Sequence, residues 1–337
     1  MPKRIGNLMP RIASLENLHE AFLRAARGKN GKRTICNFRN NLGENLAEMS
    51  RELLDGSFRF GHYHFFRIYD PKLRTICAAS FPERVAFHAM MRICHPVFDS
   101  FQTDDSFASR KGRGQYAALE RTQCLTRRFQ WFAKLDMCKY FDSIDHLVML
   151  SQLARLFKDH QLMLYFRDLL DGYEVTDGRG LPIGNLTSQY FANHYLSVAD
   201  HYAREHLRVP ALVRYMDDVL FFGNDKDVLL EQIYLYKMYI HEKLLLSIHQ
   251  PIVNKTHMGI PFLGYVVEPN RMRLNGRSQN RFRHKMARLH RELTEGRIDE
   301  RTYTERATCL SAFIEKADVQ YLKRKLCQTL GMYPLGL

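Results

Sequence analysis

The stretch LVRYMDDVLFFG, residues 212–223, places two adjacent aspartates in a run that is otherwise almost wholly apolar. Two carboxylates buried side by side repel each other and lose hydration, so the fold must supply positive charge or keep one of them protonated. Four large apolar residues follow Asp218 at once, which indicates a strand buried by packing. The alternative is that Asp217 and Asp218 simply lie in a tight hairpin turn, where aspartate is common.

A second strand-like run, WFAKLD at residues 131–136, also ends in an aspartate. If this run and the one containing Asp217 are neighbouring strands, Asp136 and Asp217 converge. Hard cations such as Mg²⁺ take carboxylate oxygens together with substrate phosphates and waters. Two such ions form a clamp for in-line phosphoryl transfer, so the predicted reaction is nucleotidyl transfer.

The remaining periodicity predicts an α+β chain without repeats or low-complexity linkers. Helices are expected at 44–58, 82–98, 185–207 and 225–246, and strands at 58–80, around a turn at 70–71, and at 261–267. The order strand, helix, strand, strand, helix, strand in the middle of the chain predicts a ferredoxin-like sheet. The segment 271–291 is rich in arginine and nearly free of acids, so it predicts a helical end with one cationic face.

The charge balance favours a polyanionic partner. Lys and Arg number 50 against 36 Asp and Glu, which gives a formal net charge of +14 in 337 residues. Nucleic acid is the leading candidate and an anionic membrane surface the second. The seven cysteines contain no C-x-x-C pair, which favours reduced thiols in a cytosolic protein, and no export signal or membrane span is visible.

With YMDD at 215–218 and D-x-x-x-Y-F-D at 136–142, the chain resembles the reverse transcriptases, in an ordered series of blocks from about Phe66 to Val267. The resemblance implies a right-hand polymerase with fingers at 1–130, a ferredoxin-like palm at 131–269 and an α-helical thumb at 270–337. It also implies two Mg²⁺ ions, with the catalytic and metal-binding positions at Asp136, Asp217 and Asp218 and a further ligand in the main-chain carbonyl of Met137.

The same resemblance assigns substrate contacts. The implied dNTP-binding residues are Lys72 and Arg74 at the triphosphate, Phe141 against a ribose 2′-hydroxyl, and Ile183 with Gly184. The implied template and primer contacts are Arg110, Lys111, Arg113, Asn185, Gln189, Phe262, Leu263 and Gly264. Lys255 is a candidate general acid for the leaving pyrophosphate, although its spacing to Phe262 is shorter than the family pattern.

The block GLPIGNLTSQYFANHYL, residues 180–196, is similar to a particular lineage, the reverse transcriptases of diversity-generating retroelements, in which it reads I-G-N-x-x-S-Q. This likeness implies copying of a template-repeat RNA into cDNA with errors mainly at adenines, for mutagenic retrohoming. It also implies an RNA–cDNA duplex as product, a barrel-like oligomer of an accessory variability protein as partner, and a cytoplasmic location in a bacterium, an archaeon or a phage-infected cell, with no membrane partner.

Two other functions remain possible from the residues. A reverse transcriptase of the antiphage or retron type would share the aspartates but should lack the segment I-G-N-L-T-S-Q. A non-catalytic RNA-binding protein would explain the charge, but it has no reason to keep three aspartates at metal-binding positions. The sequence does not reveal the target gene, the template RNA, the priming mode or the stoichiometry.

Overall fold

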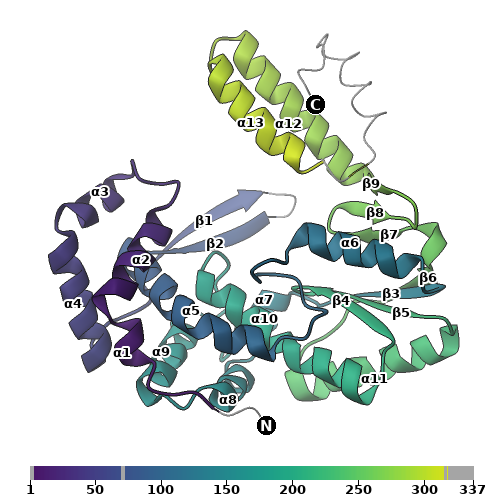
Figure 1. Ribbon diagram of the computed structural model, residues 1–337, viewed down its shortest axis with the longest axis horizontal. Helices are drawn as coiled ribbons and strands as arrows, with labels where there is room; N and C mark the ends of the chain where they lie inside the picture. Colours follow the sequence, from purple (N-terminus) through teal and green to yellow (C-terminus); the bar gives the residue numbers. More distant parts are fainter. Residues whose placement is uncertain (1–3, 70–72, 315–316, 318–337) are drawn as a thin grey trace. The chain divides into compact units, whose positions relative to one another are not determined.

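The computed structural model describes residues 4–69, 73–314 and 317, which belong to two compact units (Figure 1). Unit 1 consists of Met1–Arg110, Asp136–Arg208 and Tyr234–Gln250. Unit 2 consists of Lys111–Leu135, Val209–Ile233 and Pro251–Leu337. The boundaries of fingers, palm and thumb given above stay a prediction.

Unit 1 is mostly helical. Its elements are α1 (Met9–Ile12), α2 (Leu15–Ala26), α3 (Arg33–Asn40), α4 (Leu42–Asp55), β1 (Tyr63–Tyr69), β2 (Leu73–Ala79), α5 (Phe81–Phe101), α7 (Tyr140–Ser143), α8 (His146–Leu156), α9 (His160–Asp171), α10 (Leu186–His201) and the π-helix η1 (Tyr202–His206). Helix α5 packs against α2 on one side and α10 on another, and its apolar residues are almost fully buried. The expected helices at 44–58, 82–98 and 185–207 are confirmed, the first ending at Gly56, which takes a left-handed φ of 83°.

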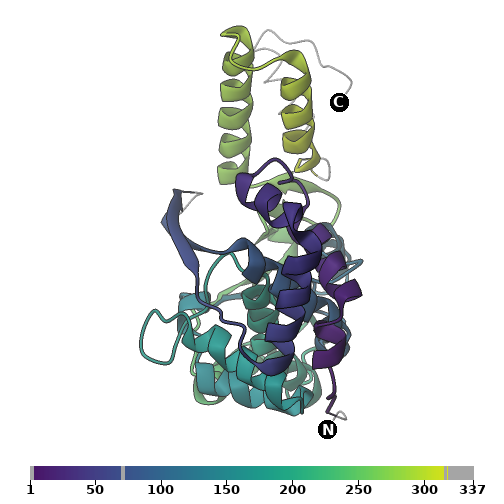
Figure 2. The same ribbon diagram turned by 90° about the vertical axis from the view of Figure 1, so that its left-hand side faces the viewer.

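The expected strand pair around residues 70–71 is also confirmed. β1 and β2 pair in antiparallel register from Tyr63↔Ala79 to Tyr69↔Leu73 and extend as an exposed arm from the helices of unit 1 (Figures 1 and 2). The base of this arm is held by Glu83, which is buried. Its carboxylate accepts hydrogen bonds from the main-chain N–H groups of Gly61 (2.6 Å), His62 (3.0 Å) and Ser80 (2.9 Å). One charged group therefore joins the residues before β1 to those after β2.

Unit 2 contains the central sheet. Its strands are β3 (Trp131–Asp136), β4 (Ala211–Tyr215), β5 (Asp218–Gly223) and β6 (Ile252–Lys255), and they lie in the order β6-β3-β5-β4. The connection from β5 to β6 runs through α11 (Lys226–Leu244), which the two units share. Helix α6 (Gln115–Thr126) packs against β4. The strand order is that of the predicted ferredoxin-like sheet, but its fourth strand is β6 and not the expected strand at 261–267.

The expected single strand at 261–267 is wrong. The chain forms a short 3-10 helix η2 (Thr256–Met258) and then a hairpin, in which β7 (Ile260–Phe262) pairs with β8 (Tyr265–Val267), and β8 pairs with β9 (Met272–Leu274). Leu263 and Gly264 form the two-residue turn, with φ of 48° and 88°. Positive φ at both positions matches the twist of a two-residue hairpin, so the turn breaks what reads as one apolar run.

The basic segment forms α12 (Gly276–Thr294), and α13 (Glu300–Ala312) lies beside it (Figures 1 and 2). Phe282, Met286 and Leu289 form the buried stripe of α12, while most of its arginines are exposed. Across the described residues, no helix has the length and apolar character needed to span a membrane. The six described cysteines are all free thiols.

Candidate active site

The turn between β4 and β5 carries the first of the two adjacent aspartates. Tyr215 pairs with Asp218, so Met216 and Asp217 form the two-residue turn, with Met216 at a left-handed φ of 54°. Asp217 is half-exposed at the tip, and Asp218 is the first residue of β5. The two aspartates therefore do lie at a tight hairpin turn, and their directions are set by that turn rather than by strand alternation alone.

Lys134, on the neighbouring strand, supplies positive charge beside the adjacent aspartates, as the sequence predicts. The Lys134 ammonium lies 2.9 Å from the carboxylate of Asp218 and donates a second hydrogen bond to the carbonyl of Pro261 at 3.3 Å. Lys134 precedes the end of β3 by two residues, and β3 lies next to β5 in the sheet. The ion pair therefore joins β3 to the first residue of β5, directly after the β4–β5 turn.

A second cation supports the turn from within. Arg214, on β4, is completely buried, and its guanidinium donates a hydrogen bond to the main-chain carbonyl of Met216 at 3.2 Å. Met216 takes the left-handed conformation, which a residue with a side chain adopts only at a cost. The bond from Arg214 holds the carbonyl of this residue and so helps to fix the turn that carries Asp217.

The main chain around Asp136 is fixed by the segment that precedes β6. The amide of His249 donates to the carbonyl of Asp136 at 2.9 Å, and the amide of Cys138 donates to the carbonyl of Ser247 at 2.8 Å. Met137 lies between these two bonds and opposite Ile248, so its own carbonyl points away from that segment. The side chain of Asp136 is exposed.

Among the described residues, no group of three or more His, Cys, Asp or Glu side chains is arranged to hold a metal ion. Magnesium is usually held by one or two carboxylates, with waters and substrate phosphates completing its shell. Asp136, Asp217 and the carbonyl of Met137 are all hard oxygen donors, so the kind of ligand fits this ion. Asp218 already has the Lys134 ammonium at its carboxylate, so its charge is balanced within the protein.

Three of the predicted nucleotide-binding positions are tied together within unit 1. The amide of Cys77, on β2, donates to the carbonyl of Ile183 at 2.8 Å, and the amide of Leu181 donates to the carbonyl of Phe141 at 2.8 Å. The segment 181–184 therefore joins β2 to α7. Arg74 is exposed on β2, three residues before Cys77, whereas Lys72 lies outside the described residues.

Gly184 allows the segment 181–184 to lie close to β2. It has a φ of 122°, and a Cβ atom there would lie 3.0 Å from the carbonyl oxygen of Cys77 and from a methyl group of Ile76. A side chain would push the segment off β2. Ile183 itself is half-buried, as is Phe141.

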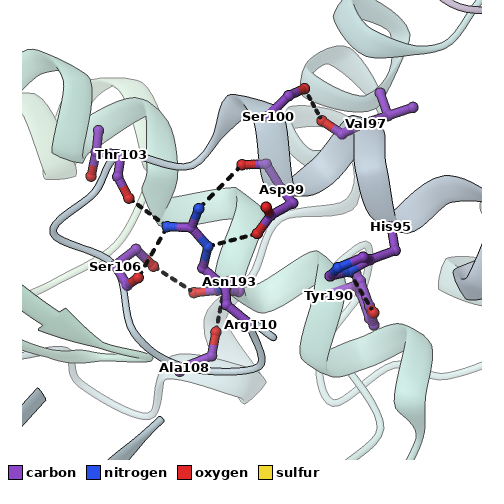
Figure 3. Close-up of polar contacts among 10 residues, drawn as sticks. All are labelled: His95, Val97, Asp99, Ser100, Thr103, Ser106, Ala108, Arg110, Tyr190 and Asn193. Atoms are coloured by element: carbon purple, nitrogen blue, oxygen red, sulfur yellow. Dashed lines mark hydrogen bonds and ion pairs between the residues drawn. The ribbon is translucent and has the colours of Figure 1, made fainter. Parts of the chain in front are cut away.

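Arg110, a predicted template contact, has its guanidinium bonded within the protein. Its side chain is only 9% exposed, and its guanidinium donates to the carboxylate of Asp99 at 2.7 Å and to the carbonyls of Thr103 (2.6 Å) and Ser106 (3.1 Å) (Figure 3). All these partners lie at or just after the end of α5. Arg110 therefore cross-links its own loop, because its donors are used inside the protein.

The other predicted template contacts lie on accessible or loop positions, with one exception. Lys111 is exposed and Arg113 half-buried in a loop where Gly112 and Gly114 have positive φ, and Gln189 is exposed on α10. Asn185 is the exception: it is 3% exposed, at the start of α10. The roles of these residues stay predictions.

The predicted primer-contacting segment divides into a buried and an accessible part. Phe262 is 1% exposed and belongs to the core of unit 2, whereas Leu263 and Gly264 are half-exposed at the β7–β8 turn. The side-chain amide of Gln115, on α6, donates to the carbonyl of Leu263 at 2.9 Å and fixes the turn. The buried ring of Phe262 is therefore not accessible to a primer, and the primer contact of Leu263 and Gly264 stays a prediction.

Lys255 is at the wrong end of the sheet for a general acid. It pairs with Trp131, the first residue of β3, and its ammonium lies 5.6 Å from the centre of the Trp131 ring. β3 then runs five residues further to Asp136, which is about 16 Å along a strand. The predicted role for Lys255 is therefore not supported.

Lys134 is the residue of this region that the sequence analysis missed. The available signal was its spacing, because residues two apart on a strand point to the same side, and Lys134 precedes Asp136 by two. Its partner Asp218 is remote in sequence, so the pairing itself depended on strand order.

Comparisons with known proteins identify the family of the chain. A family model described as "Reverse transcriptase (RNA-dependent DNA polymerase)" matches residues 70–267. A COX1/OXI3 intron 1 protein of Saccharomyces cerevisiae is 25% identical over 173 residues, which cover 49% of this chain and 21% of that protein. Protein YkfC of Escherichia coli is 24% identical over 172 residues, covering 46% of this chain and 45% of that one.

Nuclear intron maturase 2, mitochondrial, of Arabidopsis thaliana is 24% identical over 149 residues, covering 40% of this chain and 20% of the maturase. The matches thus span less than half the length of each of these curated relatives. Among solved structures, apo telomerase from Candida tropicalis truncated from its C-terminal domain aligns with a TM-score of 0.49 at 12% identity, over 64% of this chain and 55% of the telomerase.

Proposed function

Because the chain belongs to the reverse transcriptase family, whose model matches residues 70–267, we propose that it is an RNA-directed DNA polymerase. The observation that carries the proposal is the ion pair between Lys134 and Asp218. It supports a site in which the aspartate at the end of β3 and the aspartate of the β4–β5 turn act on the same substrate.

In the proposed mechanism, Asp136 and Asp217, with the carbonyl of Met137, hold divalent metal, and Asp218 is oriented by Lys134. Two bound Mg²⁺ ions would lower the pKa of the primer 3′-hydroxyl and neutralise charge on the leaving pyrophosphate. The protein contributes fixed geometry: Arg214 and the hairpin register hold the turn, and the His249 amide holds the main chain at Asp136.

The substrate side of the proposal uses the segment that joins β2 to α7. Arg74, with Lys72, would bind the triphosphate, since a guanidinium matches phosphate oxygens. The ring of Phe141 would fill the space that a ribose 2′-hydroxyl needs and so select deoxynucleotides. The turn at Leu263 and Gly264 would support the primer strand, and Lys111, Arg113 and Gln189 would contact the template.

Substitution of one turn aspartate tests the enzyme. Asp217→Asn keeps the size of the side chain but removes the charge that binds metal, so Mg²⁺-dependent incorporation of dNTPs on an RNA template should fall by about a hundredfold or more. RNA binding should be retained. Asp227→Asn, at an exposed position of α11, is the matched control and should keep full activity. Unaltered incorporation by Asp217→Asn would refute the assignment.

We further propose that the polymerase is of the kind found in diversity-generating retroelements. The support is the segment from Ile183 to Gln189, which reads I-G-N-L-T-S-Q. On this proposal the template is a template-repeat RNA, copying is error-prone at adenines, and an oligomeric accessory variability protein assists in the cytoplasm. The intron-related names of two relatives favour an intron-associated polymerase instead, and the two possibilities differ in fidelity at adenine.

A further inference from the structure

Unit 1 contains a pocket whose lining includes Gly184 and Asn185, which are predicted substrate contacts, and otherwise residues with no predicted role. It lies between the end of α2 and the turn after it, the first half of α5, and the start of α10. Its volume is about 170 Å³. The polar residues that line it are Arg24, Arg27, Lys29, Arg84, His88 and Asn185.

The lining of the pocket is cationic. The described residues that form it include three arginines, one lysine and one histidine, but no Asp or Glu. In the described part of the chain, no ion pair joins any of these five side chains to a carboxylate. Gly28, with φ of 72°, turns the chain sharply after α2, and the amide of Lys29 bonds back to Ala26 at 2.9 Å. The turn keeps both Arg27 and Lys29 at the rim of the pocket.

The positively charged side chains at the pocket repel one another, and this repulsion adds to the effect of burial on the pKa of two of them. Burial lowers the pKa of Lys29, and the nearby Arg84 and Lys32 lower it further. Burial likewise lowers the pKa of His88, with added repulsion from Arg24, Arg84 and Lys29. Each lowered pKa means that the charged form of the side chain is destabilised in this pocket. A bound anion would remove that penalty.

Two buried donors at this pocket have no hydrogen-bond partner among the residues that the structure describes. They are Nε of Arg84, whose guanidinium also lies 5.2 Å from the ring centre of Phe81, and Nδ2 of Asn185. Asn185 is 3% exposed and is the N-cap residue of α10, yet its side chain does not cap the helix. Buried donors are nearly always satisfied in folded proteins, so an unpaired pair at one pocket points to a missing acceptor.

The start of α10 adds a third source of attraction. Gly184, Asn185 and Leu186 line the pocket, so the N-terminal end of a 16-residue helix lies at it. The first N–H groups of a helix and the positive end of its dipole favour an anion. Donors from a helix start, an amide and several guanidinium groups together match a tetrahedral oxyanion.

We propose that this pocket binds a phosphate group, with Arg84 and Asn185 as its inner donors and Arg24, Arg27 and Lys29 at its rim. Its volume is below the range of pockets that enclose a whole small-molecule ligand, so it would take a phosphate and not an entire nucleotide. Two sources share this chemistry, an RNA strand and a free phosphate compound. The site lies outside the proposed metal-binding residues, and its occupancy does not require polymerase activity.

The test measures binding of the full chain to a 5′-fluorescein-labelled single-stranded RNA by fluorescence anisotropy at several salt concentrations. Arg84→Gln and Arg27→Gln should each weaken binding about tenfold, because a hydrogen bond to a charged group contributes that much. The slope of log affinity against log salt should fall by about 0.7 for each lost phosphate contact. Arg167→Gln, on the exposed surface of α9, is the control of equal charge change and should have a much smaller effect.

A second arm identifies the source of the phosphate by thermal unfolding with and without inorganic phosphate. Loss of RNA affinity without a phosphate effect on the Tm of the wild type assigns the pocket to a strand. Unchanged RNA affinity, with a phosphate-dependent rise in Tm that Arg84→Gln abolishes, assigns it to a free phosphate compound. The proposal is overturned if neither effect occurs, or if Arg167→Gln weakens RNA binding as much as the pocket variants.

Two measures keep this test interpretable. Arg27 is exposed in a turn, so Arg27→Gln still reports on the pocket if Arg84→Gln fails to fold. Repeating the binding measurements with Asp217→Asn separates the pocket from the proposed enzyme, because binding should persist in a chain that cannot incorporate dNTPs. A chain that binds RNA through the pocket but never polymerises would refute the proposed function alone.

Discussion

The ammonium of Lys134 and the carboxylate of Asp218 lie 2.9 Å apart, across the two neighbouring strands β3 and β5. Both side chains are largely shielded from solvent, at 20% and 27% exposure. The ion pair gives the two adjacent aspartates different surroundings. Asp218 has its charge balanced by Lys134, and Asp217 lies at the tip of the turn, where we expect it to bind metal.

Removal of the Lys134 charge should alter the metal requirement. In Lys134→Gln, Asp218 would present an uncompensated charge beside the proposed metal site. A unit charge at an assumed distance of roughly 6 Å in water contributes about 0.7 kcal/mol, so the Mg²⁺ concentration for half-maximal dNTP incorporation should fall about threefold. Stability should change by less than about 1 kcal/mol.

The control for this change is Lys255→Gln, which removes the same charge from the opposite end of the β3–β6 pair. It should leave the Mg²⁺ titration unchanged. An identical shift in both variants, or no shift in Lys134→Gln, would show that the ion pair has no electrostatic connection to the metal site.

The β7–β8 turn gives a stability prediction. In Gly264→Ala the new Cβ would lie 2.9 Å from the hydroxyl of Ser278 and 3.3 Å from the ring of Phe313, and φ is 88°. The left-handed conformation alone costs an L-residue about 1–2 kcal/mol, and the close contact adds to that. Urea unfolding should therefore show a loss of at least this size.

Gly276→Ala is the matched control for this substitution. Gly276 begins α12, and a Cβ there would meet nothing within 4 Å. Because alanine favours helix over glycine, the control should be neutral or more stable by up to about 1 kcal/mol. Equal stabilities of the two variants would mean that the turn at Gly264 is not constrained as described.

The sequence predicted well those features that depend on local pattern. The strand ending at Asp136 and the helix ended by Gly56 each follow from residues adjacent to one another, whereas the hairpin turn at Asp217 is only the alternative that the same kind of pattern leaves open. The hairpin at Leu263 was missed because its turn reads as part of an apolar run, although the glycine at position 264 was a signal for a turn.

Features that depend on distant partners could not be predicted. Arg110 looks like a free cation in a glycine-containing loop, but its partner Asp99 is brought to it by the end of α5. Lys255 was assigned by its place in the chain, whereas its position relative to Asp136 depends on the β3–β6 register. The cationic pocket is assembled from three separate segments, so neither its volume nor its unpaired donors can be read from any one of them.

The end of α10 gives a pH prediction. Nδ1 of His201 lies 2.6 Å from the carboxylate of Glu205, and Nε2 lies 2.9 Å from the carbonyl of Phe101. Burial opposes the charged imidazolium, but the bonds to Phe101 and Glu205 and the charge of Asp200 raise the pKa of His201 overall above its ordinary 6.5. The stabilisation from this group is therefore complete below pH 6.5 and is lost as the pH rises through the folded-state pKa.

The free energy of unfolding, measured by urea denaturation at pH 6 to 8, should reveal the pH-dependent stabilisation by His201. Because the site is partly exposed, the wild type should lose less than about 1 kcal/mol relative to His201→Gln as the pH rises. His241→Gln, at an exposed position of α11, should follow the wild-type curve. A wild type and His201→Gln with parallel curves would mean that His201 is not preferentially charged in the folded protein.

The aliphatic side chain of Ile183 should set the fidelity of copying opposite template adenine. Its main chain is fixed to β2 by the bond from Cys77, so a new side chain can be introduced without moving the segment. An apolar group next to the nascent pair restrains template and nucleotide less directionally than a hydrogen-bonding one, so mispairs are less strongly rejected. Ile183→Gln should therefore lower misincorporation opposite template adenine, measured by sequencing cDNA made from a defined RNA.

Errors opposite the other three bases provide the internal reference, and Ile183→Val, which stays apolar, should keep the wild-type spectrum. If Ile183→Gln and Ile183→Val give the same errors at adenine, the polarity of this side chain does not set fidelity, and the retroelement assignment loses its physical basis.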